Sequence, residues 1–245
     1  MNVYLIIRYD GTDFVGWQVQ PSGRSVQGEI EQAIKRVTGS ETRVTASGRT
    51  DSGVHAAGQV ANFITEAEIP PEKFAAALNA VLPKDVKIVK SGRAKDDFNA
   101  RFSAKKKTYI YNIYRSDIED PLKERYAVRV YEKLDLQKMR AAAEILEGTH
   151  DFKCFLSSGS SVKGTVRTVY SIKIVKRGAD YKFSVTGNGF LYNMVRIMVG
   201  TLIAAGAGKL ALDDIRDGLN GGARDKMGKT MPAKGLTLLK VDYFN

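Results

Sequence analysis

Residues 48–56 read Gly48-Arg49-Thr50-Asp51-Ser52-Gly53-Val54-His55-Ala56. Gly48 and Gly53 bracket a run that carries both signs of charge, and a histidine follows. Glycine lets a backbone turn sharply or approach a ligand closely, and loops held on a rigid scaffold often carry catalytic groups. The stretch predicts a functional loop around Asp51. It also fits a tight turn in which Asp51 pairs with Arg49, and the residue types alone leave both interpretations open.

The sequence around this loop predicts alternating strands and helices in the N-terminal half. Strand-like runs cover residues 3–9, 60–64 and 86–89. An apolar stripe at helical spacing follows Ser25, a good N-cap, and ends at Gly39. A second helix is expected between residues 70–71, two prolines that open it, and Pro83, which stops it.

The C-terminal half predicts a long strand over residues 109–114, with Tyr109, Tyr111 and Ile113 on one face because side chains alternate along a strand. Asp135 is the expected N-cap of a helix closed by Gly148. The remaining expected elements are a strand at 126–131, a hairpin of 166–176 and 181–186, an apolar helix at 190–205 and a last strand at 236–244.

Both halves follow the same order of elements: strand, helix, strand, strand, helix, strand. No repeat in the sequence supports this similarity, which therefore rests only on the order of the elements. It predicts an α+β protein of two units, residues 1–105 and 106–245, with the boundary inside residues 104–107. Strands and helices distributed in this way do not predict a doubly wound parallel sheet.

The composition favours a globular protein with a polyanionic partner. Of the 245 residues, 43% are hydrophobic and 27% charged, the net charge is +11, and the pI is about 9.6. A charge of this size favours nucleic acid over simple solubility, with a membrane surface as a weaker option.

The same composition bears on location. With a single cysteine, Cys154, the chain has no intrachain disulfide, which agrees with a reducing compartment. No signal peptide is visible. The weakly charged stretch 186–208 contains Arg196 and several glycines, so a core helix explains it better than a membrane span. We therefore expect a cytoplasmic protein that does not enter a membrane.

Two runs carry much of the positive charge. Residues 87–107 hold eight lysines or arginines against Asp96 and Asp97, a net of +6. Residues 160–178 hold five without an acid, namely Lys163, Arg167, Lys173, Lys176 and Arg177. These side chains are expected phosphate contacts, which position RNA without reading its sequence. Some of them will belong to an ordinary solvated face.

The stretch from Arg49 to His55 resembles the catalytic motif of the TruA family of tRNA pseudouridine synthases. Ser52 stands where the family usually has alanine, and Met231 where alanine is common. Further blocks in the same order resemble family motifs, namely residues 9–12, 16–18, 100–104, 107–109, 148–152, 187–196 and 232–236. The blocks span nearly the whole chain.

This resemblance implies a fold and an activity. The fold is two α/β subdomains whose mostly antiparallel sheets join, with helices on one side and a cleft on the other. Residues 1–105 would carry the catalytic loop, and residues 106–245 would complete the cleft. The activity is isomerisation of uridine to pseudouridine at positions 38, 39 and 40 in the anticodon stem-loop of tRNA. Neither cofactor nor metal is implied, and the expected assembly is a homodimer that binds tRNA across both subunits.

The resemblance also implies the site residues. Asp51 is the catalytic carboxylate, with Arg196 and Tyr109 in the same active site. Tyr109 would stack on the uracil, a contact of about 1–3 kcal/mol, and Arg49 would contact the nucleotide after it has flipped out of the stack. The other substrate contacts implied are His55, Arg101, Lys107 and Leu236, the last as part of an apolar wall.

The chemistry suits a single ionised carboxylate. The reaction breaks the bond between ribose and the uracil nitrogen, turns the base and forms a carbon–carbon bond, so no atom is added. A carboxylate can form a covalent adduct or stabilise positive charge on the sugar, and water must be kept out. Arg196 is the only charge in an apolar stretch and needs an anion or ordered water, which makes it a candidate partner for Asp51. Snorkelling of Arg196 to solvent is the alternative, and attack on ribose and attack on the base both stay open.

Three other functions fit parts of the sequence. Residues 222–230 come near to a P-loop but have five residues between the glycines, and no expected strand leads into them. A zinc deaminase would need more nitrogen and sulfur ligands than His55, His150 and Cys154. A non-catalytic RNA-binding module fits the charge and the aromatic content, but it leaves the loop around Asp51 unexplained.

Overall fold

The structure is a computed structural model that describes residues 1–159, 162 and 164–244. Lys163, one of the expected phosphate contacts, lies outside the described residues. The chain divides into two units, each with its own internal contacts. Unit 1 comprises Met1–Lys105 and Thr237–Asn245, and unit 2 comprises Lys106–Leu236.

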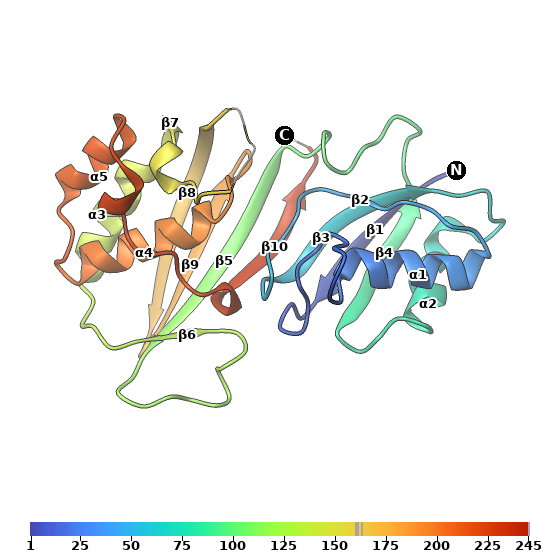
Figure 1. The fold of residues 1–245 in the computed structure, drawn as a ribbon, viewed down its shortest axis with the longest axis horizontal. Coiled ribbons are helices and arrows are strands. Elements are labelled where there is room, and N and C mark those ends of the chain that lie inside the picture. The colour runs from blue at the N-terminus through green and yellow to red at the C-terminus, as the bar shows by residue number, and fades with distance from the viewer. Residues whose placement is uncertain (160–161, 163, 245) are drawn as a thin grey trace. The chain divides into compact units, whose positions relative to one another are not determined.

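Unit 1 is a mostly antiparallel sheet with two helices (Figure 1). Its elements are β1 (Asn2–Tyr9), α1 (Val26–Thr38), β2 (Thr45–Ala46), β3 (His55–Ile64), a 3-10 turn at Pro71–Lys73, α2 (Phe74–Asn79), β4 (Val86–Arg93) and β10 (Leu236–Asp242). The strand order is β4-β1-β3-β10, and β2 pairs with β3. All these pairs are antiparallel except β3 with β10, which is parallel.

Alternation along β1 creates the core of unit 1. Val3, Leu5 and Ile7 are fully buried, whereas Arg8 on the opposite face is exposed. Phe63, the strand partner of Val3, meets Phe74 of α2 edge to face with ring centroids 5.4 Å apart. Burying an apolar side chain of this size contributes about 1.5–3 kcal/mol. The sheet face that carries these residues is the one that α1 and α2 cover (Figure 1).

Helix α1 forms where the sequence predicts it. The hydroxyl of Ser25 accepts the N–H of Gly28, and Gly39 ends the helix in a left-handed conformation with φ 73°. These two caps confirm the predicted ends of the helix.

Unit 2 has a second mostly antiparallel sheet, in the order β5-β9-β8-β7, with β6 parallel to β5. Its helices and strands are β5 (Lys106–Arg115), β6 (Val128–Val130), α3 (Leu136–Leu146), β7 (Gly148–Asp151), β8 (Val166–Arg177), β9 (Asp180–Gly187), α4 (Met194–Gly206) and α5 (Leu212–Leu219). Short 3-10 turns lie at Lys153–Phe155, Arg224–Lys226 and Ala233–Gly235.

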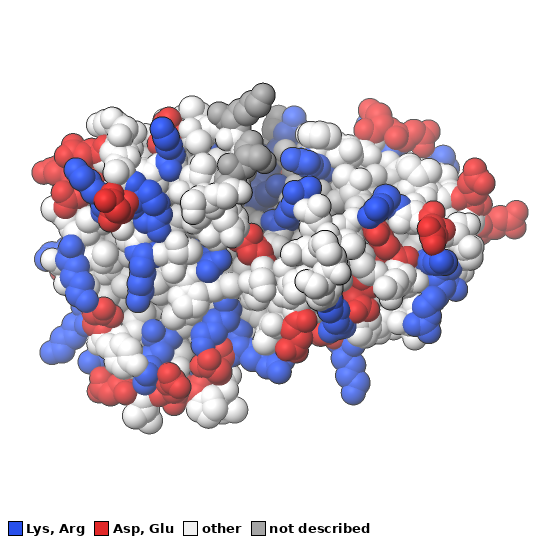
Figure 2. Space-filling view, viewed as in Figure 1, with Lys and Arg blue, Asp and Glu red and all other residues white. Residues whose placement is uncertain are grey.

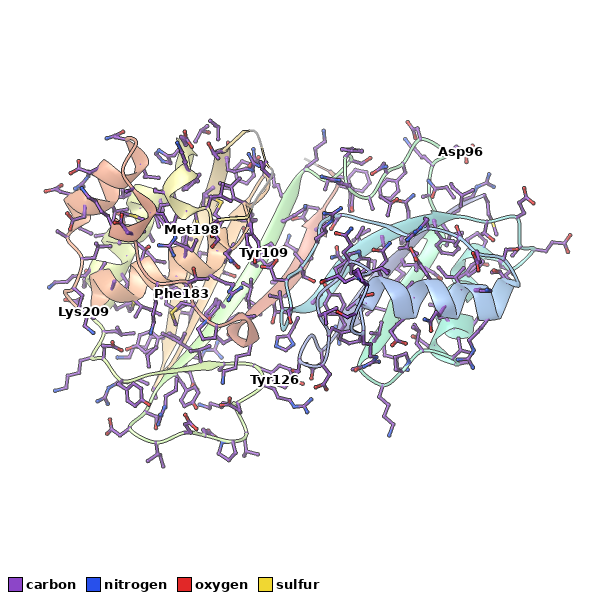
Figure 3. All side chains as sticks on the ribbon, viewed as in Figure 1. Asp96, Tyr109, Tyr126, Phe183, Met198 and Lys209 are labelled. Carbon is purple, nitrogen blue, oxygen red and sulfur yellow. The ribbon has the colours of Figure 1, made fainter. Side chains whose placement is uncertain are left out.

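Helix α4 lies at the centre of the core of unit 2. It contacts β5 and α3, and α3 in turn contacts β8 and α5, so these helices cover one face of the sheet. Phe183 of β9 and Met198 of α4 are fully buried, while Lys209 and Tyr126 are at the surface (Figure 3). Within the described residues, no helix has both the length and the apolar character needed to cross a bilayer.

Several boundaries differ from the predicted ones, for physical reasons. Helix α4 begins at Met194 rather than at residue 190, because Asn193 has φ 61° and a right-handed helix cannot include that conformation. Strand β6 is shorter than predicted, and β3 starts at His55 rather than at residue 60. Gly148 closes no helix but starts β7, a strand that the sequence did not predict because Gly148–Asp151 has no buried face. Helix α5 was also not predicted.

The expected ranges 1–105 and 106–245 place the last strand in the second unit. In the structure this strand belongs to unit 1 instead. Thr237 and Leu238 of β10 pair in parallel with His55 and Ala56 of β3 in unit 1. The backbone of β10 comes so near to β3 that a Cβ on Gly58 would lie 2.6 Å from the carbonyl oxygen of Leu239. Backbone pairing with β3 therefore returns the C-terminus to unit 1.

Candidate active site

The loop around Asp51 is held by backbone hydrogen bonds on both sides. Asp51 forms an isolated antiparallel bridge with Gly16, and the Trp17 N–H donates to the Thr50 carbonyl at 3.0 Å. On the other side the Val54 N–H donates to the Asp51 carbonyl at 3.1 Å. Asp51 is half-buried in this frame, whereas its neighbour Arg49 is exposed. The backbone therefore presents Asp51 from a fixed position.

Gly16 is the residue that allows this close approach. Its φ is 116°, and a Cβ added to it would lie 2.8 Å from the Thr50 carbonyl oxygen. A side chain is strained in this backbone conformation and would also push the loop away. In the sequence, residues 16–18 were notable only for resembling a family motif. In the structure, Gly16 and Trp17 hold the backbone of the loop around Asp51.

Thr50 is tied to the core of unit 1 through Tyr9. The two hydroxyls lie 2.7 Å apart in a buried hydrogen bond. Burial raises the pKa of the Tyr9 phenol well above its usual value, so the group stays neutral. The Tyr9 ring also packs against Trp17, with ring centroids 6.1 Å apart. These contacts fix the residue before Asp51.

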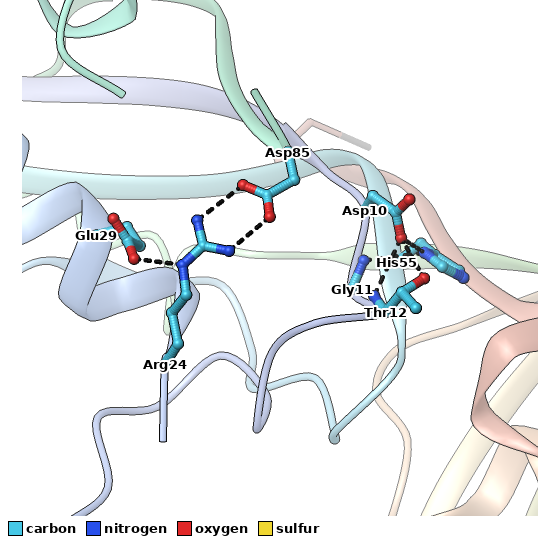
Figure 4. A network of polar contacts seen from close by, with 7 residues as sticks. All are labelled: Asp10, Gly11, Thr12, Arg24, Glu29, His55 and Asp85. Carbon is cyan, nitrogen blue, oxygen red and sulfur yellow. Dashed lines mark hydrogen bonds and ion pairs between the residues drawn. The ribbon is translucent and has the colours of Figure 1, made fainter. Parts of the chain in front are cut away.

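His55 is buried, and its ring faces Gly11 (Figure 4). Its Nδ1 accepts the Gly11 N–H at 2.9 Å and lies 3.2 Å from Asp10 Oδ1. A ring nitrogen that accepts a hydrogen bond carries no proton, so Nδ1 cannot also donate to Asp10. Asp10 Oδ1 instead accepts from the N–H and the hydroxyl of Thr12. We therefore infer the tautomer with its proton on Nε2, in which His55 holds Gly11 against the start of β3.

Arg24 stabilises the segment in front of the loop, a role that sequence reasoning missed. Its guanidinium bonds both Asp85 oxygens at 2.6 and 2.9 Å and Glu29 at 2.5 Å (Figure 4). The bonds to Asp85 raise the pKa of Arg24 further above its usual value. The guanidinium also lies 4.3 Å from the centroid of the Phe14 ring, and the Phe14 carbonyl accepts the Ser52 hydroxyl at 3.1 Å. Arg24 and Asp85 are 61 residues apart, and no local pattern predicts their contact.

In unit 2, Arg196 lies in the first turn of α4 and is half-buried. Its Nε donates to the Met231 carbonyl and its Nη1 to Asn193 Oδ1, both at 2.6 Å. The Tyr111 hydroxyl donates to the next carbonyl, that of Pro232, at 2.6 Å. Burial raises the pKa of Tyr111 well above its usual value, although the charge on Arg196 acts in the opposite direction. Two neutral acceptors inside unit 2 thus hold the arginine that the sequence singled out.

Tyr109, labelled in Figure 3, is buried on the same face of β5 as Tyr111 and Ile113, as predicted. Its ring is buried and meets Phe190 edge to face, with centroids 5.4 Å apart and planes at 88°. Such pairs contribute about 0.5–1.5 kcal/mol beyond simple burial. Phe190 is a supporting residue that the sequence had placed in a motif block and at the start of the predicted apolar helix. Leu236, also buried, begins β10.

The expected RNA contacts differ in exposure. Arg101 is exposed and Lys107 is half-buried. Arg167 Nη1 donates to the carbonyls of Gly164 and Val166, at 3.1 and 2.6 Å. On the face drawn in Figure 2, lysine and arginine side chains occur over both units with acidic side chains among them. No single basic patch dominates that face.

Comparison with known proteins decides the family. The model of the family described as tRNA pseudouridine synthase matches residues 5–103 and 142–244. The chain belongs to the tRNA pseudouridine synthase family. The first matched range contains the loop around Asp51, and the second contains the first turn of α4.

Individual relatives in the family match over almost the whole length. Three proteins named tRNA pseudouridine synthase A are 47% identical in Acetivibrio thermocellus, 45% in Thermoanaerobacter sp. strain X514 and 46% in Clostridium botulinum strain Eklund 17B. In each case the alignment covers 99% of this chain and 99% of the relative. The family isomerises uridine to pseudouridine in tRNA, so this protein is an isomerase that acts on tRNA.

Residues 222–230, which resemble a P-loop in sequence, form part of the packing around α4 in the structure. Residues 222–230 contain a 3-10 turn at Arg224–Lys226, and the Gly228 N–H donates to the Thr201 hydroxyl of α4 at 3.0 Å. In the described part of the chain, the element before this stretch is helix α5 rather than a strand. The stretch therefore packs against α4 as a surface loop of unit 2.

Proposed function

We propose that this isomerase acts on the uridines at positions 38, 39 and 40 of the tRNA anticodon stem-loop, with Asp51 as nucleophile and without a cofactor. The observation that carries the proposal is the loop of unit 1, which holds a half-buried carboxylate by backbone bonds on both sides. A nucleophile held in one geometry avoids much of the entropic barrier of its reaction. The match with the family along both halves of the chain supports the same assignment.

The reaction needs one charged group and a dry site. The bond between ribose C1′ and uracil N1 breaks, the base turns, and a bond between C1′ and C5 forms. The hydrogen on C5 leaves and N1 takes one up, so the atoms balance without a co-reactant. Asp51 must be ionised to act, and we propose that Arg196 supplies the positive charge that favours this form.

The other residues have positioning and binding tasks in this proposal. Tyr109 stacks on the flipped uracil, and its ring is already fixed edge to face by Phe190. Leu236 is part of the apolar wall that excludes water. Arg49, Arg101 and Lys107 contact the RNA. His55 is buried, so we infer that it serves the substrate through the Gly11 backbone that it holds.

The direct test is to map the product. The protein is incubated with unmodified tRNA transcripts that carry uridine at positions 38, 39 or 40, and pseudouridine is located by chemical labelling and primer extension. We expect modification at these positions and at no uridine outside the anticodon stem-loop. Modification elsewhere in the tRNA, with none at 38–40, would contradict the proposed substrate site and leave the family assignment unaffected.

Binding should depend steeply on salt because phosphate contacts release counterions. We expect the logarithm of the binding constant to fall with the logarithm of salt by roughly 0.7 for each phosphate neutralised on single-stranded RNA, and by more on duplex. The exposed Lys105 offers a single-charge test, since Lys105→Ala should reduce this slope by about one contact. Lys35→Ala is the matched control, because Lys35 pairs with Glu41 at 2.7 Å. A flat salt response would reject electrostatic docking.

We also infer that the protein is a cytoplasmic homodimer, with tRNA reaching across both subunits. The support is the resemblance to the TruA family and the family's substrate, tRNA, which is made and modified inside the cell. Multi-angle light scattering at assay concentration should give twice the mass of the 245-residue chain. The mass of a single chain, together with full activity, would contradict the dimer.

A further inference from the structure

Asn193 has a backbone conformation that needs an explanation. Of the residues that the structure describes, it is the only one other than glycine with a positive φ, at 61°. Asparagine tolerates this left-handed region better than most residues, but the conformation is still unfavourable for an L-residue. Outliers of this kind persist where the surroundings fix them, and they cluster at functional sites.

The conformation is unusual for the start of a helix. An N-cap residue normally has extended backbone and accepts an N–H of the first turn with its side chain. Ser25 and Asp135 do so in this protein, with φ −117° and −81°. Asn193 occupies the same position before α4, yet its side chain makes no capping bond. The helix therefore gives up a common source of stability at this end.

The side chain of Asn193 is used elsewhere. Its Oδ1 accepts Nη1 of Arg196 at 2.6 Å, and its Nδ2 donates to the Ser157 hydroxyl at 3.0 Å. Because the guanidinium can only donate, the amide oxygen must face Arg196, and Nδ2 then donates to the Ser157 hydroxyl, which anchors the other side of the amide. An extended N-cap would direct the oxygen to the helix backbone instead.

Arg196 has a second hydrogen-bond acceptor in the Met231 carbonyl. Nε donates to the Met231 carbonyl at 2.6 Å, while the Met231 N–H returns to the Arg196 carbonyl at 3.3 Å. The loop that carries Met231 lies directly on α4, where a Cβ on Gly228 would come within 2.2 Å of Gly200 carbon. With Nε and Nη1 both held, the planar guanidinium has little freedom to rotate.

We propose that Asn193 is a positioning residue, whose left-handed backbone and Ser157-bonded amide set the plane of the Arg196 guanidinium for the reaction. This inference rests on the proposed function, in which Arg196 acts at the uridine. Asn193 itself does not touch the reacting atoms. Its effect is on the rate of the chemical step, because a charge displaced by about 1 Å can lower a rate about a hundredfold.

The test compares Asn193→Gly with Asn193→Asp. Glycine accepts the left-handed backbone without strain but has no Oδ1, whereas aspartate keeps the acceptor and also tolerates the conformation. We expect Asn193→Gly to lower the single-turnover rate of pseudouridine formation by roughly tenfold or more, with an unchanged Kd for tRNA and no fall in Tm. Asn193→Asp should restore the rate to within about threefold of the wild type. Asn220→Gly, an exposed asparagine at the end of α5, is the matched control.

A double-mutant cycle separates positioning from a structural effect. If Asn193 acts through Arg196, Asn193→Gly should add less than about threefold to the rate loss in an Arg196→Lys background. An equal loss in both backgrounds, a loss of Tm that accounts for the rate, or an Asn193→Gly rate within twofold of the wild type would each overturn the inference. So would an Arg196→Lys enzyme with normal turnover. Failure of the proposed substrate site shows instead in the wild-type protein, as tRNA without pseudouridine at 38–40.

Discussion

Asp51→Asn should lower pseudouridine formation by at least about a thousandfold, because the amide can neither attack as a nucleophile nor balance positive charge on the sugar. The variant keeps the shape of the side chain, and the backbone bonds that hold the loop do not involve it. We therefore expect the Kd for tRNA to stay within about threefold, since the substitution removes a negative charge from a protein that binds a polyanion. The measurement is single-turnover pseudouridine yield alongside filter binding.

Asp13→Asn is the matched control for this result. Asp13 is an exposed carboxylate in the segment that packs beside the loop, so its neutralisation tests whether any lost charge there affects turnover. We expect it to react at the wild-type rate. Asp51→Ala checks that slow hydrolysis of the new amide back to aspartate has not restored activity. Wild-type yield from the asparagine or the alanine variant would remove Asp51 from the mechanism.

Arg196→Lys should lower the single-turnover rate by about a hundredfold while tRNA binding changes little. Lysine keeps the charge, but it has a single nitrogen and cannot bond Asn193 and the Met231 carbonyl while it presents a flat cation. The comparison therefore tests orientation rather than charge. Arg196→Met should be slower still, because Asp51 would then lose the cation that we propose favours its ionised form.

Arg140→Lys controls for the general effect of this exchange, since Arg140 is exposed on α3 of the same unit. A thermal melt of each variant separates loss of chemistry from loss of folding, because Arg196 bonds a carbonyl that helps to hold the loop on α4. Full activity of Arg196→Lys with an unchanged melt would show that the orientation of this cation does not matter. The assignment of Arg196 to the site would then fail.

Much of unit 1 and part of unit 2 follow from local sequence. Ser25 and Gly39 mark the ends of α1 because each bonds a backbone group that the helix terminus leaves without a partner. These capping bonds are local, so they do not depend on distant parts of the chain. The alternation along β5 predicts that Tyr109 and Tyr111 share a buried face, and the hairpin around Gly178 is also confirmed. These features depend on residues within a few positions of one another.

The supporting contacts of the site could not be predicted, because they join residues far apart in the chain. The Tyr111 hydroxyl meets the Pro232 carbonyl across 121 positions, and Arg24 meets Asp85 across 61. No periodicity signals such a pair. Asn193 is a different case, since its neighbours predict an apolar helix from residue 190. Its left-handed backbone, with the side chain bonded to Arg196, instead moves the start of α4 to Met194. The motif around Asp51 predicted the candidate carboxylate, but not the backbone contacts with Gly16 and Trp17 that hold its loop.

The return of β10 to unit 1 has a consequence for synthesis on the ribosome. The strand that pairs with β3 beside His55 is translated after all of Lys106–Leu236. About 170 residues separate the end of β3 at Ile64 from the start of β10 at Leu236, so at about 5–20 residues per second the outer edge of β3 waits roughly 9–34 s for its partner. An unpaired edge can recruit a strand from another nascent chain. Synthesis of β10, rather than emergence of the catalytic loop, therefore sets the earliest moment at which the sheet of unit 1 can be completed.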